Sequence, residues 1–326
     1  MSPSRSSARS MQVTTAKPLV KQVDHILIRV DDASSHQLFS LLSDTLQFPV
    51  VWPLTSFSSF KSGGIFAGNV DLEFLTVGSQ LVGPSRPPSS AHLYGCAFEP
   101  YPLTESFQEL ARRAIPHLPA IPYLQQNAAG QLVTVWTNVL LGNLLGSNAW
   151  MKAAFGLGKL LPAQLLTRAS SNTAASTRSA PILFDHVYRD GMIFLCEFNT
   201  AFRDMEQARA AAHATLRSRQ GGPLGFEAIQ EIIVGVRDLA VVEPRWQKLL
   251  APTAPSGEAL WQLGKGPAIR LIQHERNGLQ ALVWKVTSLA QAKQVLSEKG
   301  LLGTVLQQQI TLAPSKVQGL DIRLVE

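Results

Sequence analysis

The clearest pattern along the chain is an apolar, β-branched run, then an amphipathic stretch, then three further apolar runs. Residues 24–30 form a β-branched, apolar run that is typical of a strand. Residues 34–47 carry leucines at helical spacing, which predicts a helix with one apolar face. Short strands are expected at 48–54, 59–67 and 70–77. The predicted order is therefore strand, helix, strand, strand, strand.

The same order returns in the C-terminal half. A strand is predicted at 230–236, and a short helix opened by Pro244 follows at 243–250. Two strands are expected next, at 259–263 and 268–273. The segment therefore reads as a second copy of the unit.

A further copy completes the C-terminal half. Its strand is predicted at 282–286, and its helix has Ser288 at the N-cap and Gly300 just past its end. Strands at 305–312 and 320–325 are expected to close the unit.

The second unit of the N-terminal half is less regular. Its strand is predicted at 95–98, its helix at 104–115, and later strands at 131–141 and 192–198. An insertion at about 143–180 separates the last two strands and ends in a low-complexity stretch. The chain thus contains four βαβββ modules.

These modules define a domain plan. We expect two domains joined by a helix rich in alanine and arginine. The segments are a flexible basic tail (1–22), a first domain with the insertion (23–200), the linker helix (201–224) and a second domain (225–326).

The insertion contains an apolar, helical-looking stretch at 149–166. It could cover the mouth of the N-terminal domain as a lid, form a dimer contact, lie on a membrane surface or pack on its own domain. The pattern does not choose among these, so a homodimer stays open.

Composition limits the class of protein. The chain has 326 residues, of which 45% are hydrophobic and 16% charged, enough for a sizeable core in two domains. No apolar run reaches the roughly 18 residues of a membrane span. Two cysteines, Cys96 and Cys196, exclude a disulfide scaffold and are expected as buried free thiols. This usage fits a reducing compartment, so we expect a cytoplasmic location.

The net charge of +6 is unevenly placed. Four basic residues and no acidic residue lie in the tail 1–22, which leaves about +2 for the rest. A nucleic-acid face needs clustered lysine and arginine, so no nucleic-acid partner is expected. The tail lacks the hydrophobic segment of a secretory signal and reads as a flexible leader, although a transit peptide has a similar composition.

Three segments together resemble a known superfamily. They are VDHILIRVDD at 23–32, FAGNVDLEFL at 66–75 and LVWKVTSLAQAKQVLSEKGL at 282–301. Together with the paired βαβββ modules, they resemble the vicinal oxygen chelate superfamily of glyoxalase I, bleomycin-resistance proteins and extradiol dioxygenases. The resemblance implies an α+β fold of two glyoxalase-like domains, each a half-open eight-stranded cup.

The resemblance also implies a divalent metal ion, held by the first and last strands of the two modules in a cup. In the first module these positions match His25 and Glu73, and strand alternation places Glu73 opposite Leu72 and Phe74. Such ligands leave coordination positions open for a bidentate oxygen substrate, and Fe, Mn, Zn or Ni would suit them.

The second module matches the family less well. Gly95 stands where the family has a ligand, and Glu197 is the candidate on the last strand, in competition with Leu195. The expected metal ligands are therefore His25, Glu73 and Glu197. Each of these residues also has a plainer interpretation, as a hydrogen-bonded histidine or a surface carboxylate.

Glu73 is also the expected proton-transfer group, and His186, in an aromatic and polar patch before the last strand, is a second catalytic candidate. The plainer interpretation of His186 is a loop histidine whose ring nitrogens are hydrogen-bonded and that has no part in catalysis.

The C-terminal cup has a different set of residues at the corresponding positions. They are Glu231, Arg270, Ala281 and Arg323. Two arginines and one glutamate predict ion pairing rather than a cation site. We therefore expect this cup to be free of metal and structural.

Three functions remain open at this point. The first is a metal-dependent lyase, isomerase or dioxygenase acting on a vicinal oxygen substrate in the N-terminal cup. The second is a non-catalytic protein that sequesters an apolar or aromatic small molecule, and the third is an interaction scaffold. The binding alternative would use four aromatic side chains, Trp52, Phe74, Trp136 and Phe194. In the first two cases the expected partner is a small molecule, without membrane contact.

Overall fold

The computed structural model describes residues 17–57, 60–77, 91–127, 129–146, 191–199 and 204–326. The helix predicted at 149–166, the low-complexity stretch, His186 and most of the basic tail lie outside the described residues. In the part of the chain that is described, no helix is long and apolar enough to cross a membrane.

The first module folds in the predicted order. Its elements are β1 (Val20–Arg29), α1 (Asp32–Ser40), a π-helical turn (Leu41–Thr45), β2 (Val50–Ser56), β3 (Phe60–Phe66) and β4 (Asp71–Val77). Helix α1 begins at Asp32, two residues before the predicted start, because the Asp31 side chain caps it by accepting a hydrogen bond from the backbone N–H of Ser34.

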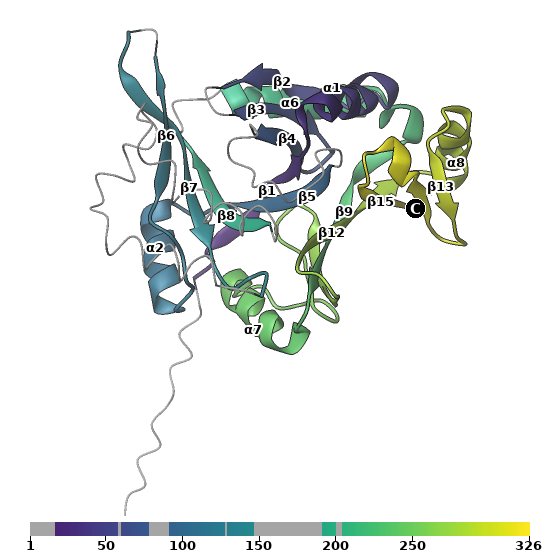
Figure 1. Cartoon of the computed structure of the whole chain (residues 1–326). Helices are drawn as coiled ribbons and strands as arrows, with labels where there is room; N and C mark the ends of the chain where they lie inside the picture. Colours follow the sequence, from purple (N-terminus) through teal and green to yellow (C-terminus); the bar gives the residue numbers. More distant parts are fainter. Residues whose placement is uncertain (1–16, 58–59, 78–90, 128, 147–190, 200–203) are drawn as a thin grey trace, which may run out of the picture.

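The second module adds one strand that the sequence pattern missed. Its elements are β5 (His92–Pro100), α2 (Leu103–Arg112), β6 (Ile121–Gln126), β7 (Leu132–Leu141) and β8 (Met192–Phe198). Strand β6 is almost wholly exposed and contains Pro122, so it lacks the apolar alternation that marks a half-buried strand. The eight strands form one curled sheet in the order β2-β3-β4-β1-β5-β8-β7-β6 (Figure 1).

The C-terminal half forms a second sheet after the linker helix. Its elements are α6 (Asp204–Ser218), β9 (Phe226–Val236), α7 (Leu239–Leu250), β10 (Leu260–Trp261), β11 (Ala268–Gln273), β12 (Gly278–Val286), α8 (Leu289–Glu298), β13 (Leu302–Val305), β14 (Ile310–Leu312) and β15 (Asp321–Val325). The strand order is β10-β11-β9-β12-β15-β14-β13. The α+β class with two curled sheets is therefore confirmed.

The second sheet differs from the expectation in strand number, with seven strands instead of eight. The chain between α7 and β10 contains Pro252 and Pro255 and forms turns rather than a strand. Proline has no N–H for a sheet ladder, which disfavours a strand at this point.

Several predicted elements have different bounds, and two in the C-terminal half also differ in character. Helix α7 begins at Leu239, because the side chain of Asp238 caps it through Val241 N, and Pro244 lies inside the helix rather than opening it. The single strand predicted at 305–312 is instead a hairpin of β13 and β14.

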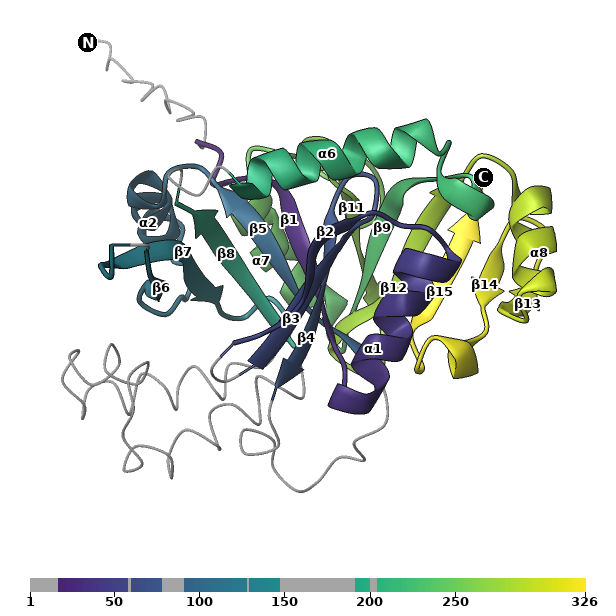
Figure 2. The same ribbon diagram turned by 90° about the horizontal axis from the view of Figure 1, so that it is seen from above.

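The two sheets share one core. Phe48 packs on Phe226 at a ring-centroid distance of 4.6 Å, and the Trp246 indole N–H donates to Leu144 O at 2.7 Å. This continuous cluster contains the inner residues of both halves, whereas each concave face has a smaller cluster of its own. Helix α6 crosses the ends of the first sheet's strands and leads to the second sheet (Figure 2). The linker can therefore place side chains at the first cup.

Candidate functional site

His25 lies on the central strand of the first cup and is 5% exposed. The ladder between β1 and β5 shifts at this point, because Val23 pairs with Phe98 and His25 with Ala97. Asp24 is therefore the extra residue of a β-bulge. A bulge re-aims side chains, which explains how two adjacent polar residues can reach the same interior.

Two carboxylates contact the two nitrogens of the His25 ring. Asp24 Oδ2 lies 2.6 Å from Nδ1, and Glu73 Oε2 lies 3.4 Å from Nε2. A carboxylate on Nδ1 fixes the orientation of an imidazole and favours a proton on that nitrogen. His25 is thus held with Nε2 facing Glu73.

Glu73 lies on β4 and faces the concave side, as alternation predicted. Its neighbours Leu72 and Phe74 belong to the shared core, and Phe74 packs edge-on against Phe39. On the cup side, the Ser62 hydroxyl donates to Glu73 Oε1 at 2.7 Å. The Glu73 carboxylate therefore has one oxygen on Ser62 and the other toward His25.

Arg209 on α6 completes the network from a distant part of the chain. Its Nη1 and Nη2 donate to the two carboxylate oxygens of Asp24 at 2.8 and 3.1 Å, and its Nε donates to Asp71 Oδ2 at 2.5 Å. The sequence analysis named neither Arg209 nor the two aspartates. Asp24 precedes His25 directly, which was a usable signal, but nothing in the sequence connects Arg209 to a residue 185 positions away.

Burial and pairing together set the charges of this network. Burial opposes the ionised form of Asp24, but Arg209 and His25 hold its pKa well below the usual range. Burial likewise opposes the charged form of His25, but Asp24 and then Glu73 raise its pKa. The interior therefore favours an ionised Asp24 beside a readily protonated His25.

Asp71 behaves differently from Asp24. Burial raises its pKa to about 6 against the opposing effect of Arg209. Its second oxygen, Oδ1, is buried without a hydrogen-bond partner among the described residues. Because an unpartnered buried oxygen disfavours the charged form, Asp71 takes up a proton more readily than Asp24.

Strand register identifies the matching positions in the second module. Leu27 pairs with both Glu73 and Gly95, and Ala97 pairs with both His25 and Phe194. By this pseudo-symmetry, Gly95 corresponds to His25, and Phe194 corresponds to Glu73. Neither offers a metal donor, and the ring of Phe194 packs edge-on against His25 at 5.5 Å.

The structure does not bring Glu197 to His25 and Glu73. Along β8, Phe194 and Cys196 face the cup, whereas Ile193 and Leu195 face the shared core. By the same alternation, Glu197 points to the side of Ile193 and Leu195. Its Oε1 accepts a hydrogen bond from Leu103 N, at the start of α2, at 2.9 Å. The carboxylate therefore caps a helix, a role that strand alternation alone did not reveal.

Cys196 is the further donor that the structure places near His25. Donor atoms of Asp24, His25 and Cys196 lie within 4.8 Å of one another, and all three residues are buried. Burial raises the pKa of the Cys196 thiol well above its usual range. Cys96 faces the shared core instead, and both cysteines are free, as expected.

Aromatic side chains line the rest of the cup. Trp136 stacks on Tyr123 at a ring-centroid distance of 4.0 Å, and Tyr123 contacts the stacked pair Phe57 and Phe60 from the opposite edge of the sheet. Of the four aromatics expected to line a cavity, Phe74 belongs to the shared core instead. Trp52 donates through its indole N–H to Ser62 Oγ at 3.0 Å, and Phe194 lies in the concave cluster.

A metal ion is the group that the resemblance implies for this cup. His25 Nε2 and Glu73 Oε2 are a nitrogen and an oxygen donor 3.4 Å apart, a separation suited to two ligands of one divalent ion. The Asp24 carboxylate behind the imidazole is the usual outer support of a metal-bound histidine. His25 and Glu73 therefore fit a divalent metal ion. Both donors come from the first module, because Gly95 and Phe194 at the matching positions of the second module offer no donor atom.

The second cup carries a different pair at the same register. Glu231 and Arg270 occupy the positions of His25 and Glu73, and Arg270 donates through Nε and Nη2 to the two Glu231 oxygens at 2.6 and 2.9 Å. Arg323, at the matching position in the last module, pairs with Asp321 instead of Glu231. The expected ion pairing is therefore present, with this change of partner.

Comparisons with solved structures agree on the architecture. The 2,3-dioxygenase LapB from Pseudomonas sp. KL28 is 11% identical with a TM-score of 0.50, and the match covers 94% of this chain and 92% of that chain. A variant of 4-hydroxymandelate synthase from Streptomyces coelicolor is 11% identical with a TM-score of 0.52, over 95% and 93% of the two chains. Homoprotocatechuate 2,3-dioxygenase from Arthrobacter globiformis is 9% identical with a TM-score of 0.51, over 96% and 81%.

At the level of sequence, no protein-family model matches the chain, and no curated protein is similar to it. The three solved structures named above are two 2,3-dioxygenases and a hydroxymandelate synthase, and identities near 10% make this a likeness of fold. The chain has the vicinal oxygen chelate fold that its sequence resemblance predicted.

Proposed function

We propose that the N-terminal cup is the active site of a metal-dependent enzyme acting on a small molecule with vicinal oxygen atoms. One observation carries this proposal: His25 is held between Asp24 and Glu73, with Nε2 3.4 Å from a carboxylate oxygen. In metal centres, a carboxylate commonly supports the histidine that binds the ion. Here Asp24 would support His25 in this way, and Glu73 offers an oxygen ligand beside it.

The chain's own residues have distinct tasks in this proposal. His25 and Glu73 hold the ion, and Asp24 keeps His25 in one orientation by accepting from Nδ1. Arg209 balances the charge of Asp24, so that the carboxylate stays ionised although it is buried. The bound ion would polarise the two substrate oxygens.

Glu73 is also placed to handle a proton. Its Oε1 is held by Ser62, whose oxygen in turn accepts from the Trp52 indole. This chain fixes the carboxylate with Oε2 toward His25 as the metal ligand, so a proton from a substrate hydroxyl would go to Oε1, the oxygen that Ser62 holds. His186 lies outside the described residues. It stays the second candidate for a catalytic group.

The donor types restrict the metal. One imidazole and one carboxylate suit Fe, Mn, Zn and Ni alike. Cys196 has its sulfur within 4.8 Å of donor atoms of Asp24 and His25, and a sulfur ligand there would favour zinc or iron over manganese, because thiolate sulfur is a soft ligand.

The residues that the second module contributes to the same cup favour a second function. Gly95 and Phe194 replace donors at the matching positions, and Trp136 and Tyr123 add aromatic surface. In this alternative the cup binds an aromatic molecule without metal, and His25 stays an imidazolium between two carboxylates.

Binding of an aromatic vicinal diol distinguishes the two functions. A Brevibacterium fuscum homoprotocatechuate 2,3-dioxygenase of this fold was solved with 3,4-dihydroxyphenylacetate, at 8% identity and a TM-score of 0.50, which motivates catechol as the probe. Chelator-treated protein is titrated with catechol by calorimetry, with and without Mn²⁺. The enzyme proposal expects binding only with Mn²⁺, and its loss in His25→Ala/Glu73→Ala.

The matched control is His36→Ala/Glu105→Ala, which removes the same side-chain types from exposed positions. It should bind like the unmodified protein. Equal catechol affinity with and without metal would reject the enzyme proposal in favour of the binding alternative.

A further inference from the structure

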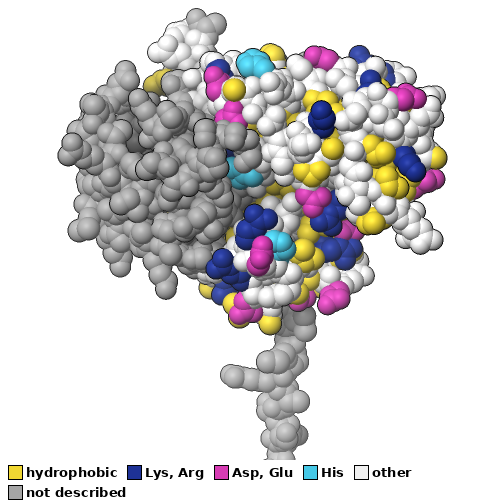
Figure 3. Space-filling model, turned by 45° about the vertical axis from the view of Figure 1, so that its right-hand side comes forward, with side chains coloured by type: hydrophobic (Ala, Val, Ile, Leu, Met, Phe, Trp, Pro, Cys, Tyr) yellow, Lys and Arg dark blue, Asp and Glu magenta, His cyan; other side chains and the backbone are white. Residues whose placement is uncertain are grey.

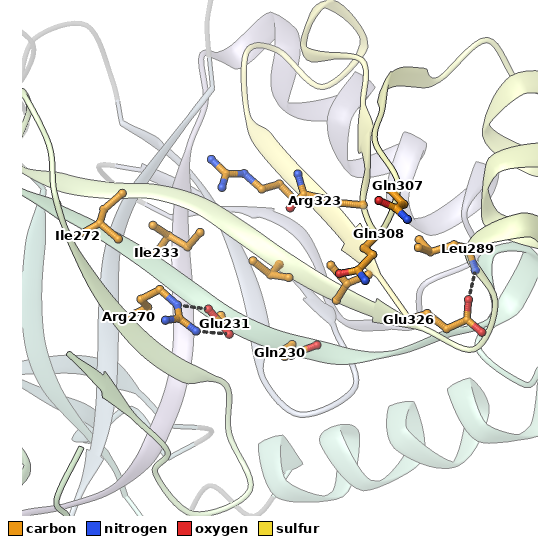
Figure 4. Close-up of a pocket in the computed structure, with 13 residues that line it drawn as sticks. Gln230, Glu231, Ile233, Arg270, Ile272, Leu289, Gln307, Gln308, Arg323 and Glu326 are labelled. Atoms are coloured by element: carbon orange, nitrogen blue, oxygen red, sulfur yellow. Dashed lines mark hydrogen bonds and ion pairs between the residues drawn. The ribbon is translucent and has the colours of Figure 1, made fainter. Parts of the chain in front are cut away.

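The concave face of the second sheet lines a separate cavity of about 790 Å³ that is partly open to solvent. Its apolar lining comes from Ile233, Ile272, Val283, Leu289 and Val325. Figure 4 labels Ile233, Ile272 and Leu289 among them. Pockets of a few hundred to a thousand cubic ångströms are the usual size for small-molecule sites. The second cup is therefore large enough for a ligand of its own.

Arginines stand on both sides of this apolar lining. Arg270 comes from β11 and Arg323 from β15, and the sheet order β11-β9-β12-β15 puts two strands between them. At the usual strand spacing this is roughly 14 Å between backbones. Two long side chains can therefore frame a molecule that lies over Ile233 and Val283.

The acceptors of the two ion pairs are already in use. Glu231 accepts from Arg270 with both oxygens, and Asp321 accepts from Arg323 with both oxygens. Glu326 Oε2 accepts from Leu289 N. Each of these three acidic side chains therefore accepts at least one hydrogen bond within the protein.

Donors, in contrast, are left over. Each of the two guanidinium groups bonds its carboxylate through Nε and Nη2, and Nη1 of each has no hydrogen-bond partner among the described residues. Both acids hold their arginines in fixed orientations, which prepares the remaining N–H groups for a ligand. A complementary ligand supplies oxygen acceptors above an apolar body.

We propose that the C-terminal cup is a second binding site, which takes a small organic carboxylate with an apolar body. The carboxylate accepts from the free Nη1 groups of Arg270 and Arg323, and the apolar body covers Ile233 and Val283. No metal is involved, because Glu231 is engaged by Arg270. The site does not depend on the proposed enzyme function of the other cup.

Calorimetry with octanoate tests this proposal on the full chain. The chain carries His25→Ala/Glu73→Ala, so that carboxylate binding at the first cup does not contribute. Octanol, which has the same apolar body without charge, is the matched ligand. The proposal expects one octanoate per chain, bound at least about tenfold more tightly than octanol, as one charge-assisted hydrogen bond provides.

Two variants locate the site. Arg323→Gln and the paired Glu231→Gln/Arg270→Gln should each weaken octanoate binding about tenfold or more, the second without leaving an unpaired buried charge. The control is Lys285→Gln, which removes an exposed cation paired with Glu227 and not lining the cavity. It should leave the octanoate affinity unchanged.

Three results would overturn the proposal. They are the absence of octanoate binding, equal affinities for octanoate and octanol, and an octanoate affinity that falls in Lys285→Gln as much as in the cavity variants. Thermal melts of each variant confirm that it is folded before titration.

Discussion

The two cups place different chemistry at the same positions of one fold. His25 and Glu73 in the first cup correspond by strand register to Glu231 and Arg270 in the second. The His25 side chain is 6% exposed and faces the Glu73 carboxylate through Nε2 at 3.4 Å, whereas the Arg270 side chain is 34% exposed and closes on its acid at 2.6 Å. The repeated backbone thus fixes where the groups lie, and the side chains decide which chemistry each cup can offer: a nitrogen and an oxygen donor in the first, a closed ion pair in the second.

The surroundings of the two pairs differ more than the pairs themselves. Both first strands carry a bulge at the preceding residue, which is Asp24 in one cup and Gln230 in the other. Only Asp24 also receives an arginine from the linker helix, namely Arg209. The first cup is therefore a buried, supported network, and the second is an open pair at a cavity.

The largest expected effect follows from that support. Arg209→Met leaves Asp24 and Asp71 buried without their cation, so we expect the free energy of unfolding to fall by about 3–5 kcal/mol. Arg270→Met, the matched change in the second cup, should cost about 1 kcal/mol or less because that pair is partly exposed. Urea unfolding of both variants measures the difference, and equal losses would contradict the contrast between the cups.

The pH dependence of stability provides a second test. The pKa of Asp71 is raised from 3.8 to about 6, so between about pH 4 and 6 the folded protein holds a proton that the unfolded chain has released. Its contribution to stability is therefore present at low pH and is lost as pH rises through 6, with a slope of up to about 1.4 kcal/mol per pH unit.

Urea unfolding across this range compares Asp71→Asn with the unmodified, chelator-treated protein. The variant should lack this slope. An unchanged pH dependence in Asp71→Asn would show that the carboxyl group does not take up a proton on folding.

The sequence predicted the positions that follow from short-range patterns. Alternation placed Glu73 on the cup side of β4, and the bounds of β8 and β11 were predicted correctly. Features that depend on long-range register were missed. The equivalence of Phe194 with Glu73 needs the pairing of four strands, and the role of Glu197 needs the position of α2.

Two further misses have local causes. Strand β6 is exposed and lacks an apolar pattern, so its hydrogen bonds to β7 define it rather than its side chains. Arg209 looked like any other charge on an Ala-rich helix. Its function as a charge partner comes from the docking of α6 on the cup.

Transfer of the first pair into the second cup sharpens the comparison. Gln230→Asp/Glu231→His/Arg270→Glu recreates the three residues at the same register. We expect the variant to bind a second equivalent of Zn²⁺, about 10–100-fold more weakly than the first cup, because no arginine supports the new aspartate. Zinc titration against a competing chelator measures both sites, and a variant with no second site would show that register alone does not suffice.

The smallest effect concerns the two cysteines. Cys196→Ser should lower the affinity for Zn²⁺ more than that for Mn²⁺, because sulfur prefers the softer ion and Cys196 lies near His25. Cys96→Ser, on the opposite face of the sheet, should change neither affinity. Equal behaviour of the two variants would remove Cys196 from the proposed donor set.

The central claim is that the first cup binds a metal ion and the second does not. Elemental analysis after Mn²⁺, Zn²⁺ or Fe²⁺ is added and excess is removed tests this on three proteins: the unmodified chain, His25→Ala/Glu73→Ala and Glu231→Ala/Arg270→Ala. The account predicts a near-stoichiometric ion in the first and third and none in the second. Metal retained by His25→Ala/Glu73→Ala, or no metal in any of the three, would contradict it.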